Sequence, residues 1–139
     1  MTATDDYLRS RAAAFGPSAT VLDLGCGDGR FVEMLLDDGL NVIGVDIPNT
    51  RAGIEARAAA RPSLNLTARI SYFTDPEIIP LPDNSVDVIL SNNVFEHIIT
   101  LNSTVAELAR ILRPGGKVYT VFPLASVVME PHCNLPWIH

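Results

Sequence analysis

The stretch VLDLGCGDGRF, residues 21–31, passes from an apolar segment into a loop with glycine at every second position. Gly25, Gly27 and Gly29 lack a Cβ atom, so a ligand can approach the backbone closely at these positions. The apolar run before the loop and the helical pattern after it predict a strand, a turn and a helix. The loop is therefore predicted to hold a ligand at the carboxyl end of a buried strand.

Two common ligands of glycine-rich loops fit this loop poorly. A phosphate-binding loop needs a lysine and then a serine or threonine after its last glycine, but Arg30 and Phe31 follow here. A dinucleotide-binding loop has the spacing G-x-G-x-x-G, but the spacing here is G-x-G-x-G. Asp23 and Asp28 would also bring negative charge towards a pyrophosphate.

S-adenosylmethionine matches the charges of the loop better. This ligand has no phosphate and carries a positive sulfonium and an α-ammonium group beside one carboxylate. Asp23 and Asp28 would attract the cationic groups, while backbone N–H groups of the loop would take the carboxylate. The structural alternative is a strand-to-helix turn that holds no ligand.

Composition limits the kind of protein and its partners. Sixteen acidic and ten basic residues give a net charge of -6, so no nucleic-acid partner is expected. Cys26 and Cys133 are too few for a disulfide framework and fit a reducing compartment. The polar start MTATDDYLRS is no signal peptide, and the apolar run Val118–Met129 is too short for a membrane span. We expect a cytoplasmic protein without a membrane span.

Short apolar runs alternate with helical patterns along the chain, which is typical of β-α-β units. Helices are predicted after the glycine loop up to Gly39, in the segment 49–62, and along 101–112, where Thr104 and Glu107 have the spacing of a capping box. Strands are predicted at Thr20–Leu24, Asn41–Ile47, Arg69–Thr74, Val86–Leu90 and Lys117–Phe122. The expected fold class is α/β: a single domain over residues 1–139 with a Rossmann-like, doubly wound, mostly parallel sheet and helices on both faces.

Two further aspartates follow predicted strands and would face the same ligand. Asp46 ends the second strand about twenty residues after the glycine loop, where a carboxylate can accept hydrogen bonds from both ribose hydroxyls. Asp75 follows the third strand and could accept from the adenine amino group, or it could serve as a turn residue before Pro76. A ribose contact is shared with nicotinamide enzymes, so Asp46 indicates an adenosine without choosing between cofactors.

The sequence resembles the class I S-adenosylmethionine-dependent methyltransferases, in particular the group called methyltransferase domain 11. The resemblance covers residues 18–122. VLDLGCGDG is similar to the first motif of the family and VIGVDI to its second-strand motif. The similarity continues through FTDPEIIPLPDNSVDVILSNNVFEHI and LARILRPGGKV. The resemblance implies S-adenosylmethionine as the cofactor.

The resemblance also implies roles for individual residues. The methionine side of the cofactor would be lined by Asp23, Gly25, Cys26 and Gly27, with Cys26 a packing residue and not a nucleophile. Asp46 would hold the ribose, Ile47 would pack on the adenine, Asp75 and Pro76 would flank the base, and Asn92 would lie beside the cofactor.

Transfer of a methyl group from a sulfonium needs orientation, exclusion of water and sometimes a base. His97 is the candidate catalytic base, with a capping or packing role as the alternative. No metal site is expected, because His132, Cys133 and His139 match no compact zinc spacing. These residues and Trp137 are instead expected to begin the substrate side.

The family sheet has seven strands, whereas five are predicted here. The fifth strand would then leave an open sheet edge, so we expect a C-terminally incomplete domain or a homo-oligomer formed through that edge. The leading hypothesis is methyl transfer to a small-molecule or lipid-like acceptor. The alternatives are a non-catalytic module that binds S-adenosylmethionine or S-adenosylhomocysteine or acts as an interaction scaffold, and, less well supported, a nicotinamide oxidoreductase.

Overall fold

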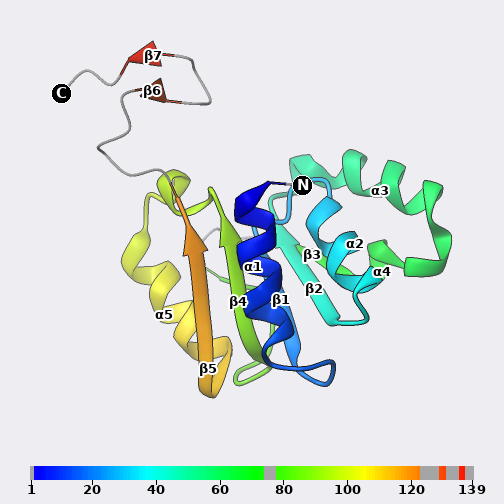
Figure 1. The fold of residues 1–139 in the computed structure, drawn as a ribbon. Coiled ribbons are helices and arrows are strands. Elements are labelled where there is room, and N and C mark those ends of the chain that lie inside the picture. The colour runs from blue at the N-terminus through cyan, green and yellow to red at the C-terminus, as the bar shows by residue number, and fades with distance from the viewer. Residues whose placement is uncertain (1, 74–77, 123–128, 131–134, 137–139) are drawn as a thin grey trace.

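The computed structural model describes residues 2–73, 78–122, 129–130 and 135–136, and a parallel β-sheet forms its centre (Figure 1). The strands lie in the order β3-β2-β1-β4-β5. Their bounds are Thr20–Leu24 (β1), Asn41–Asp46 (β2), Ile70–Tyr72 (β3), Val86–Asn92 (β4) and Leu112–Val121 (β5). Strand order reverses at β1, as in doubly wound proteins, so the predicted Rossmann-like fold class is confirmed.

Helices cover both faces of the sheet. One face carries α1 (Ala3–Ala13), α2 (Arg30–Asp37), α3 (Arg51–Ala60) and α4 (Leu66–Arg69), and in Figure 1 α1 and α2 pass in front of the strands. The other face packs against α5 (Leu101–Ile111). Three short 3-10 turns connect these elements: η1 (Pro48–Thr50), η2 (Pro62–Leu64) and η3 (Phe95–His97).

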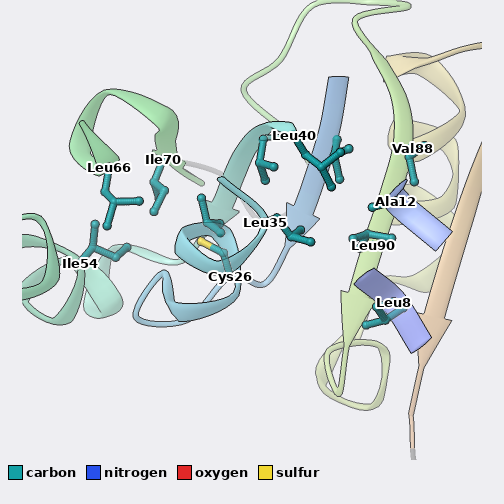
Figure 2. Packing of buried hydrophobic residues seen from close by; sticks show 13 residues of the cluster. Leu8, Ala12, Cys26, Leu35, Leu40, Ile54, Leu66, Ile70, Val88 and Leu90 are labelled. Atoms are coloured by element: carbon teal, nitrogen blue, oxygen red, sulfur yellow. The ribbon is translucent and has the colours of Figure 1, made fainter. Parts of the chain in front are cut away.

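Two apolar clusters fix the sheet between its helices. On the α1 side, Leu8 and Leu35 are fully buried against Val21 and Leu90 of the central strands, and Figure 2 shows the packing of this cluster. On the α5 side, the fully buried side chains are Leu22, Ile89 and Ile111. Because β1 and β4 are buried on both faces, their sequences read as nearly continuous apolar runs. The clusters hold the carboxyl ends of these strands rigidly at one edge of the sheet.

The end of α2 follows the sequence expectation. Gly39 adopts φ +77°, and its N–H donates to the Leu36 carbonyl while the Leu40 N–H donates to the Leu35 carbonyl. These two bonds form a Schellman motif, in which the left-handed residue turns the chain out of the helix. The chain then enters β2 directly, so the two elements that follow the glycine loop are joined by a short connection.

The predicted capping box of α5 is wrong. Helix α5 begins at Leu101 after Thr100, and Thr104 lies inside it with its hydroxyl donating to the Thr100 carbonyl. Glu107 instead accepts a hydrogen bond from the backbone N–H of Ile79, and both residues line the larger hollow described below. A capping box does form at α1, where Thr2 and Asp5 exchange side-chain and backbone hydrogen bonds.

Strand boundaries also differ from the expectations. Arg69 ends α4, so β3 is shorter than Arg69–Thr74, and Thr74 lies outside the described residues. Strand β5 starts at Leu112 and includes the Arg113–Gly116 turn signal, because a register shift against β4 accommodates the extra residues.

Beyond the sheet, β6 (Met129–Glu130) and β7 (Leu135–Pro136) pair antiparallel. Among the described residues, no helix is long and apolar enough to cross a membrane.

Candidate functional site

The glycine loop joins β1 to α2 at the carboxyl edge of the sheet. Gly25 has φ +73°, a conformation that residues with a Cβ atom rarely adopt, and its N–H donates to the Val45 carbonyl over 2.8 Å. A Cβ atom at Gly25 would lie 2.3 Å from Cγ2 of Val94. Gly29 serves as the N-cap of α2. The loop is therefore held against β2 on one side and against the segment after β4 on the other.

Two hollows lie at this edge and share Gly25 as a lining residue. The larger has a volume of about 600 Å³ and is lined by Asp46, Ile47, Phe73, Val94 and His97, among others. The smaller has a volume of about 160 Å³ and is lined by Asp5, Asp23, Cys26, Gly27, Arg30 and Asn92, among others. A ligand that passes over Gly25 would reach both hollows.

Asp46 stands at the end of β2 and is only 8% exposed. Its Oδ2 accepts the N–H of Gly27 at 2.5 Å, and its Oδ1 accepts the N–H of Ile47 at 2.6 Å. Each carboxylate oxygen has two lone pairs, so each retains an acceptor position after these bonds. Ile47 lies next to it on the cavity wall with 48% of its surface exposed. An exposed apolar side chain beside a carboxylate suits a nucleoside, because the base can pack on the apolar side chain while the sugar hydroxyls donate to the carboxylate.

Asp23 lies one step deeper, on β1, and is 3% exposed. Its Oδ2 is buried and has no hydrogen-bond partner among the described residues, and the same holds for Oδ1 of Asn92 on β4. Burial, followed by the charges of Asp46 and Asp5, raises the pKa of Asp23 to about 8. Unpaired buried polar atoms that line a cavity mark a place where a polar ligand group is accommodated.

Cys26 points into the apolar cluster on the α1 side (Figure 2). A Cβ atom at Gly44 of β2 would lie 2.8 Å from its Sγ, so the thiol fills the space that this glycine leaves. Burial, reinforced by Asp23 and Asp46, raises the pKa of the thiol, which therefore remains protonated. Packing is its evident role.

Asp28 differs from the sequence expectation that it would attract a cationic ligand. Arg57 of α3 forms an ion pair with its carboxylate and also donates to its carbonyl, and the backbone N–H of Arg30 donates to its Oδ1. Burial opposes the charge of Asp28, but the bonds from Arg57 and Arg30 outweigh it and lower the pKa. The carboxylate of Asp28 is therefore engaged by Arg57, which also pairs with Glu33.

His97 ends the η3 turn and lines the larger hollow, on whose wall Asp46 and Ile47 also lie. It is exposed and therefore accessible to a molecule in that hollow. Asp75 and Pro76, expected at the adenine, lie outside the described residues, as do His132, Cys133, Trp137 and His139. No group of three or more potential metal ligands occurs within the described part of the chain.

Two contributors to the site escaped the sequence reasoning. Asp5 is 2% exposed, and its Oδ2 accepts from Arg30 at 3.2 Å, so the first turn of α1 closes one side of the smaller hollow. Nothing in its local sequence signals this position.

The second contributor is the pair Glu107 and Arg110 on α5. Arg110 donates to Glu107 at 2.7 Å and to the carbonyls of Ile79 and Leu81 at 2.9 and 2.8 Å. The bonds from Arg110 and from the Ile79 N–H lower the pKa of Glu107 to about 2. The pair thus fastens one wall of the larger hollow, which Ile79 lines, to α5. The i, i+3 spacing of opposite charges was the available signal.

Comparison with known proteins gives consistent matches. The family model described as Methyltransferase domain matches residues 22–120. An uncharacterized methyltransferase from Mycolicibacterium gilvum is 36% identical over 121 residues, which cover 85% of this chain and 46% of that protein. A ubiquinone biosynthesis O-methyltransferase from Bartonella tribocorum is 30% identical over 99 residues, covering 71% and 39% of the two chains. The chain spans less than half the length of these curated relatives.

Solved structures agree with the sequence matches. A protein from Pyrococcus horikoshii superposes with a TM-score of 0.70 at 27% identity, covering 84% of this chain and 54% of that one. A geranyl diphosphate methyltransferase in complex with S-adenosylmethionine superposes with a TM-score of 0.68 at 25% identity, covering 85% and 47%.

Proposed function

The chain belongs to the class I S-adenosylmethionine-dependent methyltransferase family, and we propose that it transfers the methyl group of S-adenosylmethionine to a small-molecule or lipid-like acceptor. The observation that carries this proposal is the pair of hollows that share Gly25. A nucleoside in the larger hollow and an amino-acid group in the smaller one would be joined across the glycine, as the two ends of this cofactor require.

Asp46 is the residue we propose for the ribose. Its oxygens already accept the N–H groups of Gly27 and Ile47, so the carboxylate is held in place before a ligand arrives. The remaining acceptor positions would take the two ribose hydroxyls. Ile47 would pack on the adenine, and Asp75 with Pro76 would flank the base from the segment after β3.

The smaller hollow is proposed for the methionine end. Asp23, Cys26, Gly27 and Asn92 line it, and the unpaired oxygens of Asp23 and Asn92 would receive donors from the ligand. Gly25 lines both hollows, so the ligand would pass its backbone where it crosses from one hollow to the other.

When bound, the cofactor would supply an activated methyl group. The chain itself would orient the acceptor, exclude water and, where the acceptor must lose a proton, provide a base. His97 is the proposed base because it is exposed on the wall of the larger hollow. Apolar side chains, including Phe73, Ile79 and Ile98, supply much of the remaining wall and would favour an acceptor with an apolar body.

The free edge of β5 supports a further part of the proposal, association into a homo-oligomer. Within the described residues, β5 pairs with β4 alone, and Val118 and Phe122 are 39% and 46% exposed. A second copy of the chain that paired with this edge would bury these side chains and the hydrogen-bond groups of the edge, which would favour association. Light scattering that finds only monomers at high concentration would contradict this part.

Calorimetry with S-adenosylmethionine, S-adenosylhomocysteine and NAD tests the cofactor. Both sulfur ligands should bind to the wild-type chain, and substitution Asp46→Asn should weaken both. Binding of NAD without binding of either sulfur ligand would refute the proposal.

Transfer is tested separately by incubating the protein and labelled S-adenosylmethionine with fractionated small-molecule and lipid extracts. Labelled product should form in at least one fraction. Cofactor binding without transfer to any fraction would favour the non-catalytic binding module.

A further inference from the structure

Three buried carboxyl groups lie near the glycine loop: Asp5 and Asp23 line the smaller hollow, and Asp46 lines the larger one. Asp5 from α1, Asp23 from β1 and Asp46 from β2 are all at least 92% buried. Asp46 is stabilised by two backbone N–H groups, and Asp5 by Thr2 and Arg30. Asp23 differs from both, because its Oδ2 has no partner among the described residues.

The other charged and titratable groups around Asp23 do not compensate its charge. Arg30 donates to Asp5 rather than to Asp23, and its side chain is 56% exposed. Asp28 adds a negative charge and is ion-paired with Arg57, which also pairs with Glu33. Cys26 is a protonated thiol. From β4, Asn92 lines the same hollow, and its amide oxygen is itself an acceptor without a partner among the described residues.

An ionised carboxylate in such a position would be buried without a counter-charge, which is strongly unfavourable. The protonated acid avoids this cost, in agreement with the pKa of about 8 that burial and then the charges of Asp46 and Asp5 impose on Asp23. In the free protein near neutral pH, Asp23 is therefore neutral. A ligand that brings a cation into the hollow reverses the preference, because the ion pair stabilises the carboxylate.

We propose that the α-ammonium group of the cofactor takes the place of the proton on Asp23, so that cofactor binding releases one proton to the solvent. The O–H bond of the Asp23 carboxyl breaks, its electron pair stays on the carboxylate, and the carboxylate pairs with the ligand ammonium. The charges of the Asp23 carboxylate and of the ligand ammonium then cancel each other. This inference rests on the proposed function and concerns the regulation of the same site.

The inference makes cofactor affinity depend on pH in a defined direction. Below the pKa of Asp23 a proton competes with the ligand, so the apparent dissociation constant should rise about tenfold per pH unit as the pH falls below 7. The ligand ammonium itself loses its proton at higher pH, so affinity should peak near pH 8. Fluctuations of cytoplasmic pH would then shift cofactor occupancy.

Calorimetry at pH 7 in phosphate and in imidazole buffers measures the proton count, since these buffers differ in ionisation enthalpy. S-adenosylmethionine and S-adenosylhomocysteine should each release close to one proton. Methylthioadenosine, which has the nucleoside and the sulfur but no ammonium group, should release close to none.

The substitution Asp23→Asn should abolish proton release with S-adenosylhomocysteine while methylthioadenosine still binds. Asp28→Asn is the matched control, because it removes a carboxylate of the same loop that is already ion-paired with Arg57, and it should leave the proton count unchanged. Equal binding enthalpies for S-adenosylmethionine in the two buffers, or full proton release by the Asp23→Asn variant, would overturn the inference alone. Failure of all three ligands to bind the wild-type chain would overturn the proposed function with it.

Discussion

Gly25 is the residue at which the geometry of the loop can be tested most directly, by the substitution Gly25→Ala. The new Cβ atom would lie 2.3 Å from Cγ2 of Val94 and 3.1 Å from its Cγ1. Ordinary contact begins at 3.4 Å, so Val94 would have to move by about 1.1 Å. Valine has few alternative rotamers, so the segment after β4 would have to shift with it.

Two costs add up in this variant. An alanine at φ +73° costs about 1–2 kcal/mol, partly offset by the smaller entropy of the unfolded chain. Forcing a methyl group into an occupied site costs about 1–3 kcal/mol more. The free energy of unfolding should therefore fall by about 2–4 kcal/mol in total.

Urea denaturation separates the two costs when three more variants are included. Gly16 has φ +81° and no atom within 4 Å of a Cβ position, so Gly16→Ala should show the backbone cost alone. Val94→Ala removes the methyl groups that clash, so the double variant with Gly25→Ala should be about 1–3 kcal/mol more stable than the sum of the single effects. Cofactor affinity should stay at least about tenfold weaker in the double variant, because alanine at φ +73° still strains the loop that lines both hollows. If Gly25→Ala destabilises no more than Gly16→Ala, the contact with Val94 is not as described.

Three other substitutions test the remaining parts of the site. Asp46→Asn should weaken S-adenosylhomocysteine binding about hundredfold in calorimetry, since asparagine removes the charge and replaces one of the two acceptor oxygens by an NH2 donor, and unchanged affinity would exclude the ribose contact. Glu107 has a pKa of about 2 in the folded chain against 4.5 for the unperturbed side chain. Its contribution to the free energy of unfolding is therefore present above pH 4.5 and is lost as the pH falls towards 2. Glu107→Gln should therefore lower unfolding free energy by about 2 kcal/mol at pH 7 and much less at pH 3, and an equal loss at both pH values would contradict this linkage. His97→Gln should leave cofactor affinity within about twofold and slow transfer about hundredfold or more, and equal transfer rates would remove His97 as the base.

The sequence was sufficient for those features that local patterns encode. Apolar runs at Thr20–Leu24 and Asn41–Ile47 predicted β1 and β2, the second one residue too long, because both strands are buried on two faces. The carboxyl ends of parallel strands meet at one edge of the sheet, so the sequence alone predicted that Asp23 and Asp46 lie near one another. Gly39 predicted the end of α2 because a left-handed residue is needed there.

Long-range partners decided what local patterns could not. Thr104 and Glu107 match a capping box in spacing, yet Glu107 forms its bonds with Arg110 and with Ile79, which is 28 residues away in the sequence. Likewise, Asp28 and Asp23 were equivalent as acids flanking a glycine loop. The position of Arg57, on a helix that starts more than twenty residues later, shows that Asp28 is ion-paired.

Asp23 and Asp28 have different surroundings in the folded chain, and this difference determines which of them could attract a cation. A loop with two equivalent carboxylates would attract any cation, with little preference for where it binds. Asp28 is paired to Arg57 and Asp46 is engaged by backbone N–H groups, whereas the buried Oδ2 of Asp23 has no partner among the described residues. In the proposed complex, the 160 Å³ hollow around Asp23 would take the amino-acid end, and the nucleoside would occupy the larger hollow. The burial that would make Asp23 selective for an ammonium group also raises its pKa in the free chain, so the proposed ligand selectivity and the proposed proton release would have one physical cause.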